Sequence, residues 1–408
     1  MKKVLSRIPG TIKAVGAVSF LLNASTLMVF SIFGLYLRDV LKISYSKIGF
    51  LDGAVEAFSF VMKVFSGIIS DFLMNRKCLF LIGTFFLFIA KPLEAVVTGY
   101  WPLFHVKILE RLGNGLQSTP RDAIVGDWAP KGMKATCFGL RQSFAALGSV
   151  TGAVLAAILF RATGDYQFVF WLAAIPSLIA FVIVFHCIKE KKAETPVVAA
   201  TAKYRKITLA EIGKLGPGYW VLIAVAGTYM ISKVTESITI LHAVKTLNWT
   251  GYQTPICMIC YQLANSVVSL PFGMLSDKLK SRENVFIIGI VVFIISDLLF
   301  IFGKSEVTII AALIFLGAYV GVAQSIFPAK IIDIVPKDLK GTGIGIFNLV
   351  CAASFLVGGT LAGYVAEHHS LRHTFILSSC LASVSLVVLI VYRGYVRRQS
   401  RHDEIQRY

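Results

Sequence analysis

Charged side chains lie inside several long apolar stretches of this sequence, and a charge in such a setting is costly and rarely idle. Glu56 lies in one stretch, Glu110 and Arg111 are adjacent in a second, and Lys233 and Glu236 lie three residues apart in a third. A carboxylate in a partly dry cavity favours its neutral form and can therefore take up and release a proton, while a fixed cation attracts an anionic group. The pattern predicts reversible protonation and anion binding rather than covalent catalysis.

The same spacing allows a purely structural interpretation. Glu110 with Arg111, and Lys233 with Glu236, could each form a permanent ion pair. Lys91 and Glu94 flank Pro92, a helix-breaking residue, and these two charges could satisfy each other at a kink or belong to a polar path. Both interpretations are open at the level of sequence.

The elements that carry these charges are predicted from composition. Of the 408 residues, 56% are hydrophobic and 15% are charged, whereas soluble domains carry about 25% charged residues. A membrane-spanning helix needs roughly 20 apolar residues. The fold class predicted is therefore an all-α integral membrane protein of about twelve transmembrane helices. The apolar runs place the spans at 14–37, 46–73, 77–99, 101–125, 135–160, 165–187, 217–243, 251–275, 284–303, 305–332, 341–366 and 373–393.

The sequence lacks the residues that other classes of function require. The seven Cys residues fall almost entirely in apolar runs, and the C-x-x-C pair Cys257 and Cys260 has neither a second pair nor a nearby His. Packing is the simpler interpretation, so we expect no metal, no cofactor and no enzyme site. The net charge of +18 is spread over short clusters between apolar runs, which excludes a folded nucleic-acid module. A receptor or scaffold would need a larger soluble module than residues 188–215 provide.

The long polar segment 188–215 predicts the domain organisation. It separates a six-helix bundle over residues 1–187 from a second bundle over 216–395, and a basic tail follows at 396–408. Lys and Arg cluster on the side that holds both ends of the chain, and this bias predicts cytoplasmic termini. We expect a multi-pass monomer in the lipid bilayer of the cell (inner or plasma) membrane.

The two halves also repeat. Gly67 to Asp71 (GIISD) recurs as Gly273 to Asp277 (GMLSD), a shift of 206 positions. In each case the motif closes an apolar run and basic residues follow. Repeated halves of about six spans are typical of secondary transporters.

These motifs resemble those of the major facilitator superfamily over essentially the whole chain. The G-x-x-x-D…R-K signature between spans 2 and 3 carries the resemblance, together with an R-x-x-N-G sequence on span 4 and a glycine-rich stretch, Gly148 to Ala153, on span 5. The resemblance implies that the signature Asp and the loop basic residues latch the cytoplasmic side. The gating residues expected are Gly67, Asp71, Arg76, Lys77, Arg121, Asp122, Asp277 and Arg282.

In the resembled family, spans 1, 4, 7 and 10 line a central cavity, and this mapping predicts the remaining site residues. The substrate-binding residues expected, with additions from spans 5 and 8, are Asn23, Lys107, Arg111, Arg141, Tyr229, Lys233, Tyr261, Gln262 and Gln324. The proton-coupling residues expected are Asp52, Glu56, Glu110 and Glu236.

The function predicted is secondary active transport of a small polar organic solute by alternating access, coupled to protons. The many basic residues inside spans favour an anionic or zwitterionic solute. One alternative is a drug or metabolite efflux antiporter, which would need a more apolar cavity. A membrane-embedded enzyme is the alternative from a different class.

Overall fold

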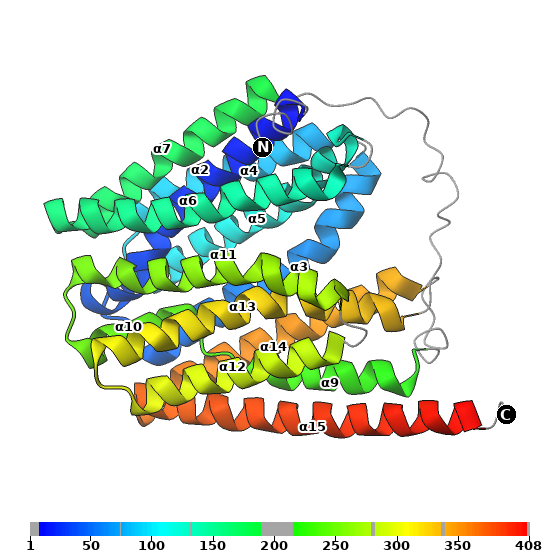
Figure 1. Ribbon diagram of the computed structural model, residues 1–408. Helices are drawn as coiled ribbons and strands as arrows, with labels where there is room; N and C mark the ends of the chain where they lie inside the picture. The colour runs from blue at the N-terminus through cyan, green and yellow to red at the C-terminus, as the bar shows by residue number, and fades with distance from the viewer. Residues whose placement is uncertain are drawn as a thin grey trace. The chain divides into compact units, whose positions relative to one another are not determined.

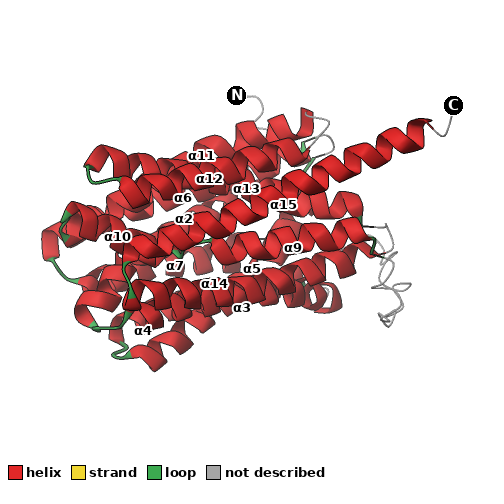
Figure 2. Cartoon of the chain, turned by 90° about the horizontal axis from the view of Figure 1, so that it is seen from below, coloured by secondary structure: helices red, strands yellow, loops and turns green. Residues whose placement is uncertain are grey.

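The computed structural model describes residues 8–73, 75–130, 133–188, 215–278, 282–335 and 339–405. For residues 63, 67–73, 134–135, 269–278, 282–286, 322–334, 340–341, 392 and 395–405 the description covers the backbone but not the side chain. In these ranges the chain consists of helices and loops, without a strand (Figure 2).

The helices match the predicted spans one for one, except for span 7, which is formed by two helices (Figure 1). Their bounds are α2 Gly10–Leu35 with a π-helical turn Tyr36–Val40, α3 Tyr45–Leu73, α4 Arg76–Val96, α5 Tyr100–Trp128, α6 Lys134–Thr163, α7 Tyr166–Cys187, α9 Pro217–Ser232, α10 Glu236–Leu247, a 3-10 turn Gly251–Gln253, α11 Thr254–Lys278, α12 Arg282–Phe302, α13 Glu306–Ile334, α14 Lys340–His368 and α15 Leu371–Ile405.

The span expected at 217–243 corresponds to the segment Pro217–Leu247, but its helix is interrupted. The α-helical backbone stops after Ser232, Lys233 is extended at φ −68° and ψ 112°, and α10 starts at Glu236. Val234 and Thr235 fill the gap, and their β-branched side chains suit an extended backbone better than a helical one. Hydropathy averaged over a span could not detect the break, because the segment Pro217–Leu247 as a whole is apolar.

Seven helical segments in the described ranges are long and apolar enough to cross a membrane. They are Gly10–Val40, Arg76–Val96, Thr136–Thr163, Tyr166–Cys187, Pro217–Leu247, Thr342–His368 and Leu371–Val391. Two helices outside this set, α3 and α5, carry several charged residues within the helix. These two helices supply much of the candidate site.

The chain divides into two compact units. Unit 1 comprises Met1–Ser44, Ala54–Lys206 and Asn248–Gln262, and unit 2 comprises Tyr45–Gly53, Ile207–Leu247 and Leu263–Tyr408. The first turns of α3 thus group with unit 2, and the first turns of α11 with unit 1. Most of the predicted linker lies outside the described residues.

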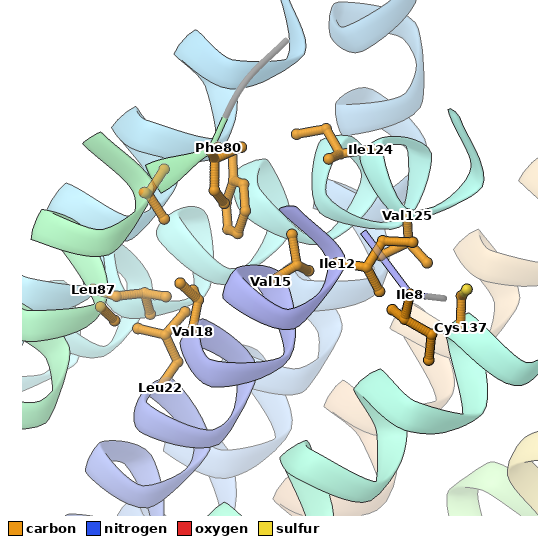
Figure 3. Packing of buried hydrophobic residues seen from close by; sticks show 13 residues of the cluster. Ile8, Ile12, Val15, Val18, Leu22, Phe80, Leu87, Ile124, Val125 and Cys137 are labelled. Atoms are coloured by element: carbon orange, nitrogen blue, oxygen red, sulfur yellow. The ribbon is translucent and has the colours of Figure 1, made fainter. Parts of the chain in front are cut away.

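The core of unit 1 forms around α2, which packs against α6 and α7. Side chains of α2 such as Ile12, Val15 and Val18 are fully buried, and they meet Phe80 of α4 and Val125 of α5 (Figure 3). A helix that is apolar on all sides is stable only where other helices or lipid cover it. This core holds α4 and α5 in place for the charged residues described below.

Unit 2 has an aromatic core. The rings of Phe300 and Phe375 stack at 4.6 Å between centroids, and the His242 ring lies 4.9 Å from that of Phe375. The His242 Nε2 atom lies 3.0 Å from the carbonyl oxygen of Phe300. Close backbone packing adds to this core, because a Cβ built on Gly49 of α3 would lie 2.3 Å from the carbonyl oxygen of Gly359 on α14.

Candidate functional site

Four buried charges from two neighbouring helices form a closed ring in unit 1. Lys91 and Glu94 lie on α4, and Lys107 and Glu110 lie on α5. The Lys107 Nζ atom is 2.8 Å from Glu94 and 3.0 Å from Glu110, while Lys91 contacts Glu110 and lies 3.4 Å from Glu94. Every side chain is at most 7% exposed. Two cations and two anions sum to zero, which makes this charge ring tolerable in an apolar setting.

The hairpin of α4 and α5 determines how the charge ring is assembled. Gly99 turns the chain between the two helices with a left-handed φ of 109°. Farther along, a Cβ built on Gly83 would lie 2.7 Å from the backbone nitrogen of Gln117, so the helices approach at backbone distance. Small residues permit such approach in membrane bundles. The Lys107 Nζ also lies 4.1 Å from the ring centroid of Phe33 on α2.

A second ion pair lies beside the charge ring but is more open. The Arg111 guanidinium is 3.1 Å from the Glu56 carboxylate on α3. Their side chains are 21% and 38% exposed. Glu110 and Arg111 therefore face different helices although they are adjacent in sequence, because consecutive residues point about 100° apart around a helix. The partners of Glu110 are Lys91 and Lys107 rather than Arg111, and its role in proton coupling stays a prediction.

Asn23 lies at the close contact between α2 and α6. The Ser149 hydroxyl donates to the Asn23 side-chain oxygen at 3.4 Å, and the Asn23 amide donates to the Ser19 carbonyl at 2.7 Å. A Cβ on Gly148 or Gly152 would lie 2.1 or 2.2 Å from a carbonyl oxygen of α2. The glycine-rich stretch on span 5 therefore serves close helix packing.

Two of the basic residues expected at the gate, Arg76 and Lys77, have partners on other helices. Arg76, at the start of α4, forms an ion pair with Asp127 near the end of α5. The Lys77 ammonium donates to the Phe185 carbonyl on α7 at 2.9 Å. These contacts join the ends of three helices at the predicted cytoplasmic side.

A further ion-pair network joins α5 to α6. The Asp122 carboxylate lies 3.0 Å from the Arg121 guanidinium and 3.4 Å from that of Arg141. Arg141, predicted to bind substrate, thus shares the Asp122 carboxylate with Arg121, and Arg121 and Asp122 are both predicted gating residues. Several expected residues lie outside the described side chains, and their roles stay predictions: Gly67, Asp71, Asp277, Arg282 and Gln324.

The break between α9 and α10 brings Lys233 to a distinctive position in unit 2. Lys233 is half-buried, and its Nζ lies 5.5 Å from the ring centroid of Phe355 on α14. In the part of the chain that the structure describes, no carboxylate lies within 4.0 Å of this cation. The alternative of a permanent ion pair between Lys233 and Glu236, which begins α10 and is half-buried, is therefore not observed.

The remaining residues predicted to bind substrate or a proton are buried or half-buried. Tyr229 is fully buried and packs against the rings of Phe293 and Tyr319 at 5.9 and 5.5 Å. Tyr261 is 4% exposed, and Gln262 and Asp52 are half-buried. Among the described residues no group of three or more His, Cys, Asp or Glu side chains could hold a metal ion.

Comparison with known proteins decides the family. The model of the Major Facilitator Superfamily matches residues 15–232 and 221–407. The chain belongs to the major facilitator superfamily. It is therefore a multi-pass membrane transporter, and the predicted twelve-helix fold of this family is confirmed.

Two curated relatives and one solved structure are similar to this chain over different lengths. It is 28% identical over 387 residues to the uncharacterized MFS-type transporter MJ1317 of Methanocaldococcus jannaschii, covering 92% of this chain and 93% of the relative. It is 24% identical over 147 residues to the quinolone resistance protein NorA of Staphylococcus aureus, or 36% and 37% of the two chains. The crystal structure of the nucleoside transporter NupG matches 94% of this chain and 98% of that one, with a TM-score of 0.70 and 15% identity.

Two contacts of this facilitator could not be found by sequence reasoning. Asp127 is not among the residues expected at the gate, but it is the partner of Arg76, 51 residues away. Lys91 was expected to pair with Glu94 within one helix, but it also contacts Glu110 on α5. The i,i+3 spacing of charges on both helices was the only available signal, and it could not identify the helix that supplies the partner.

Proposed function

We propose that this chain moves a small polar organic solute with an anionic group, anionic or zwitterionic overall, by alternating access coupled to protons. We further propose that it does so in the cell membrane, with both termini in the cytoplasm. Membership of the family supports the transport activity. The proposed solute class and the proposed proton coupling rest on Lys233 and on the pair of Arg111 and Glu56, respectively.

The half-buried cation Lys233 carries the proposal for the solute. A charged residue at the centre of a membrane segment costs about 2.5–3.5 kcal/mol on insertion scales. Such a cost is normally offset by an ion pair, and none is found for Lys233 in the described residues. The ammonium group instead lies over an aromatic ring at the break between two half-helices. An anionic group on the solute would complete this site.

The pair of Arg111 and Glu56 carries the proposal for coupling. A proton on Glu56 removes the carboxylate charge that holds the guanidinium, and Arg111 can then bind an anionic group. Release of the proton restores the pair. The partial exposure of both side chains, 21% and 38%, gives protons and solute access to them.

Drug efflux is the second candidate, and the similarity to NorA over about a third of the chain favours it. Efflux of apolar drugs requires aromatic side chains that face a cavity. Tyr229, Phe293 and Tyr319 instead pack against one another and are at most 2% exposed. The aromatic residues of this region therefore favour the polar solute.

Flux into proteoliposomes tests the proposal. A panel of organic carboxylates, amino acids, neutral metabolites and cationic drugs is offered with and without a pH gradient. We expect uptake of an anionic or zwitterionic member, and at least about tenfold slower uptake in Lys233→Ala and Arg111→Ala, since tenfold corresponds to only about 1.4 kcal/mol of lost binding. Lys245→Ala, an exposed cation on the same span, serves as the matched control. Unchanged flux in both site variants, or preference for cationic drugs, would overturn the proposal.

A further inference from the structure

Two arginines of unit 1, Arg121 on α5 and Arg141 on α6, share a single carboxylate and form the arginine pair. The Asp122 Oδ1 atom lies 3.0 Å from the Nε atom of Arg121 and 3.4 Å from that of Arg141. The two arginine side chains are only 12% and 13% exposed, whereas that of Asp122 is 41% exposed. The three residues therefore carry one net positive charge, and the two cations are the enclosed part of the group.

The two helices hold the arginine pair at the same depth. Arg121 lies seven residues before Trp128, where α5 ends, and Arg141 lies seven residues after Lys134, where α6 begins. Seven residues are about two helical turns, or about 10 Å along each helix axis. The arginine pair thus lies about two turns from the predicted cytoplasmic ends of these helices.

The arginine pair has more hydrogen-bond donors than the described acceptors use. Each guanidinium carries five N–H groups. Arg121 donates to the Asp122 carboxylate at 3.0 Å and to the side-chain oxygen of Gln117 at 3.4 Å. Arg141 donates to the side-chain oxygen of Gln142 at 3.1 Å, and its buried Nε has no hydrogen-bond acceptor in the described part of the chain. Because a buried charged donor without an acceptor is destabilising, an oxyanion between the two guanidiniums would stabilise them.

The charge balance of the group favours a carboxylate as this oxyanion. Two guanidiniums and one aspartate sum to one positive charge, so a monoanion makes the site neutral, and a neutral set of charges is the one that an enclosed site tolerates. A dianion such as a phosphate ester would leave a net negative charge. A carboxylate also matches the guanidinium, which binds it through two parallel hydrogen bonds. Asp122, the most exposed member, already presents such a group to both arginines.

We propose that Arg121 and Arg141 form a second binding site for the solute, that this site takes a single carboxylate group, and that Asp122 occupies it between transport events. The inference rests on the proposed anionic solute and names its anionic group. It gives Arg121 a binding role besides the gating role expected from the sequence. The site belongs to unit 1, whereas Lys233 belongs to unit 2.

Thermal unfolding of the purified, lipid-reconstituted protein in the presence of acetate tests this inference without transport. Sodium acetate replaces sodium chloride at constant ionic strength and neutral pH. An anion that binds only the folded protein raises the Tm with its concentration, and this dependence gives an apparent Kd. We expect the apparent Kd to rise at least about tenfold in Arg121→Gln and in Arg141→Gln, since tenfold corresponds to about 1.4 kcal/mol, within reach of one lost charged hydrogen bond. Arg161→Gln, at an exposed position of α6, is the matched control and should bind acetate as the wild type does.

The variant Asp122→Asn distinguishes a binding site from a structural ion-pair network. Removal of the aspartate charge leaves the arginine pair without its internal competitor, so acetate should bind at least about threefold more tightly, a modest effect because the lost charge is partly exposed. In a purely structural network, all three site variants would lower the Tm and leave its dependence on acetate unchanged. That result would overturn the inference.

Two further measurements keep the test decisive. If a glutamine variant yields no folded protein, Arg121→Lys or Arg141→Lys keeps the charge without the planar fork of donors, and it must still weaken acetate binding. Sulfate is compared between the wild type and the Arg121→Gln/Arg141→Gln variant, which removes its general stabilising effect, and tighter site-dependent binding of sulfate than of acetate would overturn the assignment to a carboxylate.

The outcomes for this site and for the proposed function are separable. Flux of an anionic solute through a protein whose arginine pair does not bind acetate would reject this inference and leave the proposed function standing. Preference for cationic drugs in the flux assay, together with acetate binding that depends on the arginine pair, would reject the proposed solute and retain the carboxylate site.

Discussion

Gly152→Leu is expected to yield no folded protein. A Cβ at this position would lie 2.2 Å from the carbonyl oxygen of Ala24, and at Gly148 one would lie 2.1 Å from that of Phe20. The atoms that would have to move are backbone atoms of α2, which is the helix at the centre of the unit 1 core. The expected cost exceeds the roughly 1–3 kcal/mol of ordinary overpacking in a core.

Size-exclusion chromatography of detergent extracts, followed by thermal unfolding of any monodisperse fraction, measures this effect. Gly139→Leu is the matched control, because Gly139 lies on the same helix, is exposed and has no atom within 4 Å of a built Cβ. We expect the control to elute and melt as the wild type. A monodisperse Gly152→Leu with an unchanged Tm would show that α2 and α6 are not in backbone contact.

Lys107→Met is expected to destabilise the protein by about 3–5 kcal/mol, the usual cost of breaking a buried ion pair by removing one partner. Lys107 contacts both carboxylates of the charge ring, and its removal leaves Glu94 and Glu110 with Lys91 alone. Two buried carboxylates would then share a single cation. Thermal unfolding in detergent at neutral pH measures the loss.

Charge balance distinguishes this effect from lost packing. The double variant Lys107→Met/Glu94→Gln is neutral again, and we expect it to recover much of the lost stability although it differs more from the wild type. Lys245→Met, at an exposed position of α10, should leave the Tm unchanged. If the double variant is no more stable than Lys107→Met, the ring does not act as a balanced set of charges.

Much of the fold could be predicted from the sequence because it depends on local composition. Apolar runs of the length of a bilayer identify spans, and the repeated GIISD and GMLSD motifs indicate two related halves. The break after Ser232 could not be predicted in this way. It depends on the backbone conformation of Lys233, which the mean hydropathy of the segment does not report.

The sequence predicted which charged residues belong to the candidate site, but it did not predict which of them form ion pairs with one another. Glu110 and Arg111 are neighbours in sequence, and adjacency suggested a pair. Helical geometry separates them, and α3 and α4 supply the actual partners. The structure places Lys107 in the charge ring, and the expectation that it binds substrate stays a prediction. Sequence spacing within one helix carries no information on which other helix packs against it.

Proton movement during solute transport tests the central claim most directly. Proteoliposomes that contain a pH-sensitive dye are given a gradient of the transported solute, and the internal pH is recorded for the wild type, Glu56→Gln and the exposed control Glu367→Gln. The account predicts a solute-dependent pH change in the wild type and the control, and its loss in Glu56→Gln. A pH change of wild-type size in Glu56→Gln would contradict the coupling of protons to solute through the pair of Arg111 and Glu56.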